Sequence, residues 1–440
     1  MGFVKLAQRG GALILVLCGT ALAANAPAID AATSQLNTSD STSNVDSLVA
    51  AVLDRNPGIA AMRAAVDGAG ARVELAGALD DPMVSYLVAP NTAGGPRQGL
   101  NQNLQVSQAI PWPGTLNLRV RAARAEVLSA NRLLDDARLR LAATTRGVYA
   151  QWYYVHRALA VNAENRKLLK RLVSVAESAY ASGQSPQQDV LQAQVELTRL
   201  QSQKLELERQ RRVVKSKINT LLDRTADSTI AMPDELPSAH PLPEYATLQA
   251  AALAGYPMLQ SLDARLAAGR DRIALAHKNN YPQFKLIAGY NSIMDLPAKR
   301  LTVGVSINIP FGGNHRGELG EANARVLEAQ AKLEQARSQL LGDLDQAYAS
   351  ATQADATIRL YAGKLLPLIQ LNLQAAEADY AGGNGDFLKV ITAEQQDLIA
   401  NLELVRARTD LFTQLASLDY QTGGALFHTL ANAPTLEVGP

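Results

Sequence analysis

Histidine, cysteine and carboxylate side chains, which carry most metal binding and catalysis in proteins, are scattered along this 440-residue chain. The five histidines are His156, His240, His277, His315 and His428. None of them has a metal-ligand spacing to another, and the only cysteine is Cys18. No carboxylate or histidine accompanies a nucleophile in the pattern that covalent catalysis requires. The sequence therefore predicts no enzyme, no metal site and no cofactor.

Glycine, tyrosine and charged residues instead gather in two motifs, YASGQSPQQD from Tyr180 and YAGGNGDFLK from Tyr380. Two further motifs, IPWPG from Ile110 and IPFGG from Ile309, combine proline with an aromatic residue. All four contain residue types that end or redirect regular structure. Their role therefore depends on the helices and strands that they connect.

Composition narrows the class of protein. Lys and Arg number 42 against 41 Asp and Glu, so the formal net charge of +1 gives no bulk attraction to nucleic acid. Aromatic residues make up only 5% of the chain and apolar residues 47%. An apolar fraction rich in Ala and Leu favours long, closely packed helices over a β-sandwich.

The N-terminus has the pattern of a cleaved secretory signal. Lys5 and Arg9 precede an apolar run over residues 10–22, and a small-residue cleavage site ends at Ala23. The run is shorter than the roughly 20 residues that a membrane-spanning helix needs. Lipidation of Cys18 is an alternative, although a leucine stands before it where such sites have a small residue.

No apolar stretch after this signal reaches bilayer-spanning length, so any part of the chain that enters a membrane must do so as β-strands. The remaining destinations are the periplasm, the medium and the outer membrane.

The chain repeats itself at an offset of about 200 residues. Five landmarks keep the same order in both halves: Asn56-Pro57 with Tyr256-Pro257, Asp81-Pro82 with Tyr281-Pro282, Ile110-Pro111 with Ile309-Pro310, the Tyr180 motif with the Tyr380 motif, and the runs that begin at Asp189 and Lys389. Such agreement indicates an internal duplication.

Each half is predicted to contain a helix, a β-hairpin, a very long helix, a turn and a last helix. After a signal peptide (1–23) and a polar segment (24–45), the first repeat covers 46–222, with a helix to 77, a hairpin at 83–110, a long helix at 114–179, a turn at 180–186 and a helix at 187–222. A proline-rich connector covers 223–243. The second repeat covers 244–422, with a helix to 278, a hairpin at 283–309, a long helix at 313–379, a turn at 380–386 and a helix at 387–422, before a tail at 423–440.

The predicted strands alternate apolar and polar residues. In 301–309, Leu301, Val303, Val305, Ile307 and Ile309 face one way, and the polar or small residues between them face the other. A sheet that covers a soluble core gives the same pattern. Two such hairpins on an exported chain, each beside very long helices, favour strands that face lipid on one side and water on the other.

Four strands are too few to close a membrane barrel, because the smallest barrels have eight. We therefore expect the chain to oligomerise. Two copies make a filled eight-stranded barrel, and three copies make a twelve-stranded barrel with a wet lumen, which the polar strand faces favour. A helix of 65 residues extends about 100 Å, so the helices must project far beyond the membrane. A coiled-coil rod is equally consistent with the helical pattern but leaves the strands unexplained.

The IPWPG and IPFGG motifs then lie where a strand becomes a helix. Pro111, Pro113 and Pro310 end a strand and suit the first turn of a helix. Trp112 and Phe311 are expected at the membrane–water boundary, where amphipathic aromatic residues collect, with buried packing as the alternative.

On this duplicated plan, and on SQAIPWPG, SINIPFGG, YASGQSPQQDVLQAQVEL and YAGGNGDFLKVITAEQ, the chain resembles the TolC-like outer membrane efflux proteins over residues 46–425. The resemblance implies an α+β homotrimer. Its twelve-stranded outer-membrane β-barrel, four strands from each chain, continues into a long periplasmic α-helical barrel. It also implies a non-catalytic exit duct of a Gram-negative tripartite efflux system, which conducts metal ions or small toxic compounds. The PWPG form is more similar to the heavy-metal branch than to the drug-efflux branch.

The resemblance also implies partners. The two turns become periplasmic tips that close the duct at rest and dock on an adaptor protein and an inner-membrane pump of the RND type, while the strands contact outer-membrane lipid and no nucleic acid is bound. The residues expected at the tips are Tyr180, Gly183, Asp189, Tyr380, Gly383, Asp386 and Lys389.

One position departs from the family pattern. Members often place aspartates just past the second turn, where they constrict the lumen, whereas this chain has Asp189 in the first half and Lys389 in the second. The opposite charges predict an ion pair between neighbouring hairpins that holds the tips shut. Solvated charges on exposed turns are the alternative, because exposed pairs contribute little stability.

Two other functions stay open at this level. A periplasmic coiled-coil adaptor or scaffold fits the long helices, although such a protein is expected to have one main hairpin and a β-rich region after it. The outer-membrane duct of a protein secretion system also fits, because the pump chooses the substrate.

Overall fold

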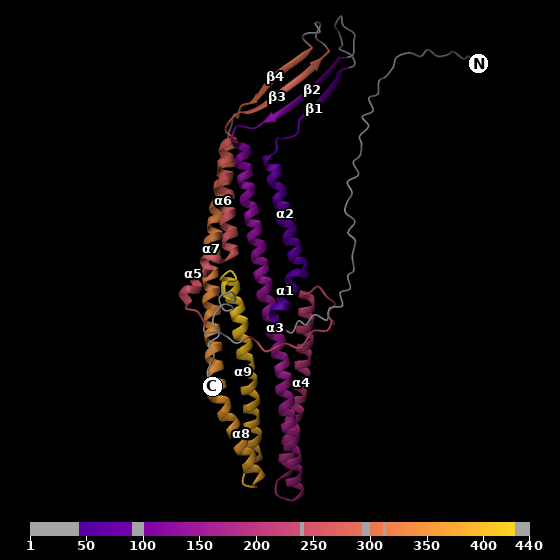
Figure 1. The fold of residues 1–440 in the computed structure, drawn as a ribbon, viewed down its shortest axis with the longest axis vertical. Helices are drawn as coiled ribbons and strands as arrows, with labels where there is room; N and C mark the ends of the chain where they lie inside the picture. Colours follow the sequence, from indigo (N-terminus) through magenta and orange to yellow (C-terminus); the bar gives the residue numbers. More distant parts are fainter. Residues whose placement is uncertain (1–43, 90–100, 238–241, 293–299, 311–313, 427–440) are drawn as a thin grey trace, which may run out of the picture. The chain divides into compact units, whose positions relative to one another are not determined.

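The computed structural model describes residues 44–89, 101–237, 242–292, 300–310 and 314–426, and the order of elements repeats in the two halves (Figure 1). The first half contains α1 (Val45–Arg55), α2 (Pro57–Gly77), β1 (Met83–Ala89), β2 (Asn101–Ile110), α3 (Thr115–Ala181) and α4 (Gln187–Leu221). The second half contains α5 (Tyr245–Gly255), α6 (Pro257–Lys278), β3 (Gln283–Asn291), β4 (Leu301–Asn308), α7 (Asn314–Leu360), α8 (Leu366–Ala381) and α9 (Phe387–Gln421).

The helix expected first in each half, 46–77 and 244–278, is two helices with a break before a proline. Asn56 and Tyr256 have extended backbones, with ψ of 121° and 114°. Proline lacks an amide hydrogen and pushes the preceding residue out of the helical conformation. Each proline therefore ends one helix and begins the next, which the expectation of a single helix missed.

The long helix expected over 313–379 is also divided. α7 ends at Leu360, a π-helical turn spans Tyr361–Leu365, and α8 continues from there with Pro367 in its first turn. Proline cannot donate the usual helical hydrogen bond, and the wider π turn accommodates its ring. α3, which has no proline, is continuous over 67 residues.

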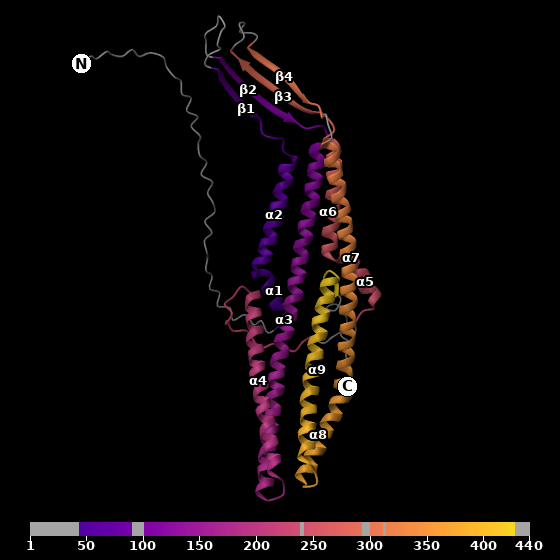
Figure 2. The same cartoon turned by 180° about the vertical axis from the view of Figure 1, so that it is seen from behind.

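The four strands form one antiparallel sheet in the order β1-β2-β3-β4 (Figure 2). The two halves of the chain meet at its centre, where β2 pairs with β3 and Ile110 lies opposite Phe284. β1 and β4 are the edge strands, and within the described chain neither has a partner on its outer side.

The strand register sorts the side chains onto two faces, because residues directly opposite each other in neighbouring strands share a face. The mainly apolar face carries Val84, Tyr86, Val88, Leu104, Val106, Ile110, Phe284, Leu286, Ala288, Tyr290, Leu301, Val303, Val305 and Ile307. The mainly polar face carries Asn103, Gln105, Ser107, Lys285, Thr302 and Ser306. The apolar face is largely uncovered, since the Val303 side chain is 82% exposed.

Helices α2, α3, α6 and α7 form a single layer in that order. α3 contacts α2 and α6, and α6 contacts α7. Each of these helices joins one strand of the sheet directly, so the order of the helices equals the order of the strands (Figures 1 and 2). At the other end of the layer, α4 packs on α3, and α9 packs on α3, α7 and α8.

Three apolar clusters hold the helices together. One joins α1, α3 and α4 around Val52, Tyr149 and Ile218. A second joins α5, α6, α7 and α9, with Leu344 and Leu418 fully buried. The third lies near the two helix turns and is described below. Within the described residues, no helix combines the length and apolarity needed to cross a bilayer.

The described part of the connector begins with turns over residues 223–228 that hydrogen-bond to Asn219 of α4. Residues 229–237 have no regular structure and run along α3. The Trp152 indole Nε1 donates to the carbonyl of Ala231 (3.1 Å), and the Tyr153 hydroxyl donates to Glu235 Oε2 (2.6 Å). These bonds fix the connector between the two repeats against α3.

Candidate functional site: the paired helix turns

The two helix turns, α3–α4 and α8–α9, share one backbone geometry. Gly183 and Gly383 have φ of +73° and +76°, in the left-handed region that glycine adopts without steric cost. The amide of each glycine donates to a tyrosine carbonyl, Tyr180 (3.0 Å) in the first turn and Tyr380 (3.1 Å) in the second. The motif residues therefore form the turns themselves.

The second turn is tighter than the first. A Cβ on Gly385 would lie 2.6 Å from the backbone nitrogen of Tyr380, so only glycine fits there, whereas the first turn has Ser185 at the corresponding position. Asp386 caps α9 by accepting from the amide of Leu388 at 3.0 Å. The two repeats thus differ in how the returning helix begins.

The two turns contact each other through Tyr380 and Asp189. The Tyr380 hydroxyl donates to Asp189 Oδ2 at 3.4 Å, and its ring packs against Phe387 at 5.0 Å between centroids. A cavity of about 520 Å³ lies between the two turns and is lined by these residues. Burial raises the pKa of Asp189 and the charge of Asp386 adds to the rise, while the bond from Tyr380 opposes it.

Tyr180 and Lys389 are exposed, and the described chain contains no ion pair between Lys389 and Asp189. α9 turns Phe387 and Val390 toward the core, which leaves Lys389 on the outer side. Within one chain, Asp189 therefore has the Tyr380 hydroxyl as its partner. An ion pair between neighbouring copies stays a prediction.

A buried carboxylate lies in the third apolar cluster, which contains Leu169, Leu172, Ala176, Val190, Ala193, Leu200, Phe387, Val390, Ile391 and Leu398. Glu394 on α9 is fully buried, and neither of its oxygens has a hydrogen-bond partner among the described residues. Burial, followed by the nearby charges of Glu196 on α4 and Asp397 on α9, raises the pKa of Glu394 to about 7. Glu196 itself pairs with Arg199 at 3.4 Å.

Glu394 was not among the site residues predicted from the sequence. Its signal was present, because Glu394 stands in the helical stripe formed by Phe387, Val390, Ile391 and Leu398. A charged residue in an apolar stripe is buried when the helix packs, and the hairpins meet at this position.

At the strand-to-helix junction, Trp112 packs between the halves. Its ring stacks on Tyr281 (4.9 Å between centroids) and Phe284 (5.9 Å). Gly114, with φ of +85°, follows Pro113 and is the N-cap residue of α3. Aromatic stacking therefore joins the two halves at this junction. The expected place of Trp112 at the membrane–water boundary stays a prediction.

In the second half, Pro310 is half-buried and lies two residues after Asn308, where β4 ends. Phe311, Cys18 and the predicted signal lie outside the described residues.

The histidines in the described part of the chain are His156, His277 and His315, and they lie on different helices. No group of three histidine, cysteine or carboxylate side chains in the described residues is placed to hold a metal ion. His156 packs edge-on against Trp152, and burial lowers its pKa.

The fold has known counterparts among solved structures. VceC, an outer membrane protein of Vibrio cholerae, is 20% identical, with a TM-score of 0.76 over 86% of this chain and 96% of that chain. The MtrE outer membrane channel of Neisseria gonorrhoeae is 17% identical, with a TM-score of 0.74 over 87% and 90%. CusC, solved in a study of transmembrane channel formation, is 18% identical, with a TM-score of 0.77 over 86% and 92%. The chain therefore has the fold of an outer membrane channel protein.

The sequence comparison defines the family. The family model described as outer membrane efflux protein matches residues 48–222 and 248–424, one match in each half. These stretches make up most of the chain, which therefore belongs to the outer membrane efflux protein family, TolC-like transport proteins. A comparison with curated protein sequences gave no match. Membership of the heavy-metal branch stays a prediction.

Proposed function

We propose that this protein is the outer-membrane exit duct of a tripartite efflux system and that it works as a homotrimer. The observation that carries the proposal is the four-stranded sheet, whose two edges are unpaired and whose apolar face is exposed in the single chain. Unpaired edges and a bare apolar face are unstable in water and are satisfied when copies join edge to edge in lipid.

The number of strands in the sheet supports three copies. Four strands from each of two copies make an eight-stranded barrel, which side chains fill, whereas three copies make twelve strands and leave a lumen. The polar face, with Lys285, Asn103 and Thr302, suits a wet interior. The matching order of helices and strands lets the helical layer close into a ring together with the sheet.

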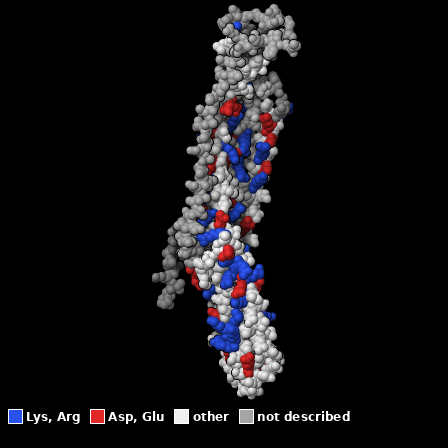
Figure 3. All heavy atoms as spheres, turned by 90° about the vertical axis from the view of Figure 1, so that its right-hand side faces the viewer, with Lys and Arg blue, Asp and Glu red and all other residues white. Residues whose placement is uncertain are grey.

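The surface charge agrees with this placement. Figure 3 shows mostly uncharged atoms in the described part of the sheet end, whereas Lys, Arg, Asp and Glu side chains lie along the helices. In this proposal the sheet lies in the outer membrane of a Gram-negative bacterium and the helices lie in the periplasm.

The paired turns then form the periplasmic entrance. The contact between Tyr380 and Asp189 holds the two hairpins of one chain together in a closed state, and opening requires that contact to break. The turns dock on a periplasmic adaptor and, through it, on an inner-membrane pump of the RND type. Transport through the duct is passive, and its substrates are small toxic compounds or metal ions.

Mass and conductance test this proposal. Protein extracted in detergent from outer membranes is expected to give the mass of three chains by native mass spectrometry and discrete conductance steps in planar bilayers. A soluble monomer from the periplasmic fraction would refute the duct and favour an adaptor or scaffold.

A matched pair of variants tests the membrane face. Val303→Arg places a charge on the apolar face and Thr302→Arg places the same charge on the opposite face. A charge near the middle of the bilayer costs about 2–4 kcal/mol, so only Val303→Arg is expected to reduce trimer yield. Equal yields would contradict the assignment of the faces.

The substrate is tested in a deletion strain. Sensitivity to a panel of metals and antibiotics identifies the exported class, and restoration by the wild-type chain confirms it. Loss of a secreted protein without any change in sensitivity would instead favour a protein secretion duct.

A further inference from the structure

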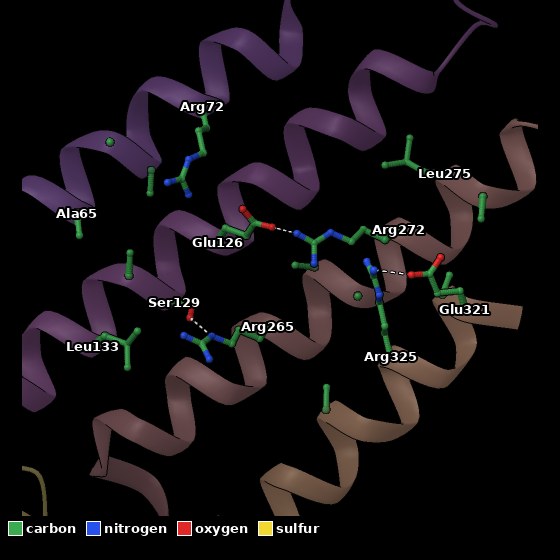
Figure 4. Close-up of a pocket in the computed structure, with 18 of the residues that line it drawn as sticks. Ala65, Arg72, Glu126, Ser129, Leu133, Arg265, Arg272, Leu275, Glu321 and Arg325 are labelled. Atoms are coloured by element: carbon green, nitrogen blue, oxygen red, sulfur yellow. Dashed lines mark hydrogen bonds and ion pairs between the residues drawn. The ribbon is translucent and has the colours of Figure 1, made fainter. Parts of the chain in front are cut away.

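A pocket of about 760 Å³ opens on one face of the layer formed by α2, α3, α6 and α7 (Figure 4). Residues from all four helices line it, so the layer curves around the pocket and this face is concave. When copies of such a layer close into a ring, the concave face becomes the inner face. The pocket lies away from the paired turns and shares no residue with them.

The floor of the pocket is apolar and made mainly of small residues: Ala64, Ala65, Gly68, Ala69, Ala130, Ala268, Gly269, Ala276 and Ala322. Leu133 and Leu275 add larger side chains at its sides. Apart from the adjacent residues and the backbone of its own helix, no atom lies within 4 Å of the position that a Cβ on Gly68 would take, so this glycine leaves the pocket open. The floor therefore offers contact area to an apolar ring or chain.

Four arginines surround this floor: Arg72 from α2, Arg265 and Arg272 from α6, and Arg325 from α7. Two of them are neutralised, because Arg272 pairs with Glu126 and Arg325 pairs with Glu321. The third carboxylate of the lining, Glu318, accepts from Asn279 Nδ2 at 3.0 Å.

The other two arginines have no carboxylate partner in the described part of the chain. Arg265 donates from Nε to the neutral Ser129 hydroxyl at 3.1 Å, and no hydrogen bond or ion pair joins Arg72 to a described residue. Figure 4 shows their side chains directed toward α3 from the helices on its two sides. Two guanidinium groups without carboxylate partners thus flank one apolar floor.

We propose that this pocket binds a small amphipathic organic anion, whose carboxylate or sulfonate group pairs with Arg72 and Arg265 while its apolar body lies on the alanine floor. A planar guanidinium matches such oxygen pairs with two parallel hydrogen bonds. That this anion is a transported substrate rests on the proposed duct function, whereas its binding to the pocket does not.

The test uses two dyes with the same ring system and opposite charge. Fluorescein carries a free carboxylate, and rhodamine 6G is a cation whose carboxyl group is esterified. Fluorescence anisotropy with the detergent-purified full chain, corrected for detergent alone, is expected to show saturable binding of fluorescein and weaker binding of rhodamine 6G. Added salt should weaken the binding of fluorescein. Equal binding of the two dyes would overturn the proposal.

Paired substitutions then locate the site. Arg72→Ser with Arg265→Ser is expected to weaken fluorescein binding by about tenfold or more. The control is Arg63→Ser with Arg270→Ser, which removes the same charge from exposed positions outside the pocket. Arg63 lies nine residues before Arg72, on the opposite side of α2. An equal loss in the control would indicate bulk charge attraction and overturn the site.

A second pair of variants changes the shape of the pocket and leaves its four arginines in place. Gly68→Leu fills the pocket, while Gly70→Leu adds the same side chain in open space on α2 outside the lining. Only Gly68→Leu should reduce binding, and unaltered binding would contradict the pocket. Conductance of the same samples separates the two proposals. Wild-type channels that conduct but do not bind fluorescein refute only the anion site. A wild-type protein that does not conduct refutes the duct.

Discussion

Replacing Glu394 with glutamine is expected to stabilise the contact between the two hairpins at alkaline pH and to leave it unchanged at acid pH. Glu394 is fully buried in the apolar cluster of α3, α4 and α9, and its nearest charges are the carboxylates of Glu196 and Asp397. Glutamine has nearly the same shape and cannot ionise, so the change removes charge and little else.

The magnitude follows from the pKa of Glu394. Burial and the two neighbouring carboxylates raise it from 4.5 to about 7, a difference of about 2.5. The packed state therefore holds the proton more tightly than the opened state. The free energy needed to open the packed hairpins is highest below pH 4.5, where both states are protonated. It falls as the pH rises from 4.5 to 7 and is lowest above that range. At 1.36 kcal/mol for each pKa unit, the full loss is about 3 kcal/mol.

Hydrogen exchange of the full chain, purified in detergent, at pH 5 and pH 8 measures this effect locally. Amides in peptides over 387–398 and 190–200 should exchange at nearly equal rates in the wild type and in Glu394→Gln at pH 5. At pH 8 the variant should exchange more slowly by up to about a hundredfold, because opening then costs more free energy.

A matched control is Glu177→Gln, which removes an exposed carboxylate from α3 near the first turn. It should not change exchange in these peptides at either pH. Ionisation of Glu394 does not weaken the contact if the variant and the wild type exchange alike at pH 8, or if their difference is the same at both pH values. The second outcome would mean that glutamine acts through packing and that ionisation plays no part.

Four further changes test the turns and the junction. Tyr380→Phe removes the hydroxyl that donates to Asp189 and should weaken the contact between the two turns by about 1 kcal/mol. The expected result is a higher single-channel conductance. An unchanged conductance would contradict the proposal that this hydrogen bond keeps the turns closed. Gly385→Ala brings a Cβ to 2.6 Å from the Tyr380 nitrogen and should cost the second turn more than about 1 kcal/mol of protection from hydrogen exchange. Trp112→Ala removes two stacked contacts worth about 0.5–1.5 kcal/mol each, so the thermal midpoint should fall, with Trp112→Phe falling less. Lys389→Asp should raise selectivity for cations, measured as a reversal potential across a KCl gradient, and an identical potential would place Lys389 away from the ion path.

The turns could be predicted from the sequence because their causes are local. Gly183 and Gly383 occur where the chain needs a left-handed residue, and a tyrosine three positions earlier accepts the bond from each glycine. Such constraints act within a few residues, so the same letters at an offset of 200 indicate the same turn twice. The helix breaks before Pro57 and Pro257 were equally local, and their two prolines were already among the landmarks of the repeat.

The side-chain contacts at the paired turns and in the arginine pocket could not be predicted from the sequence. Sequence periodicity shows that Glu394 belongs to an apolar stripe, but the charge of Glu196 reaches it only because α4 packs against α9. Arg72 and Arg265 are 193 residues apart, and nothing in their surrounding sequence indicates that they flank one pocket. Asp189 and Tyr380 are 191 residues apart and meet only when the two hairpins pack, while Lys389 stays exposed.

The sequence by itself thus determined the duplication, the two strand-to-helix junctions, the glycine turns and the alternation of the strands, since backbone conformation and side-chain period depend on neighbours along the chain. Only the tertiary structure decided that β2 pairs with β3, that four helices form one layer in the order of their strands, and which side chains meet across that layer. The physical reason is that these contacts join residues far apart in sequence. Their free energy exists only after the helices and the sheet have packed.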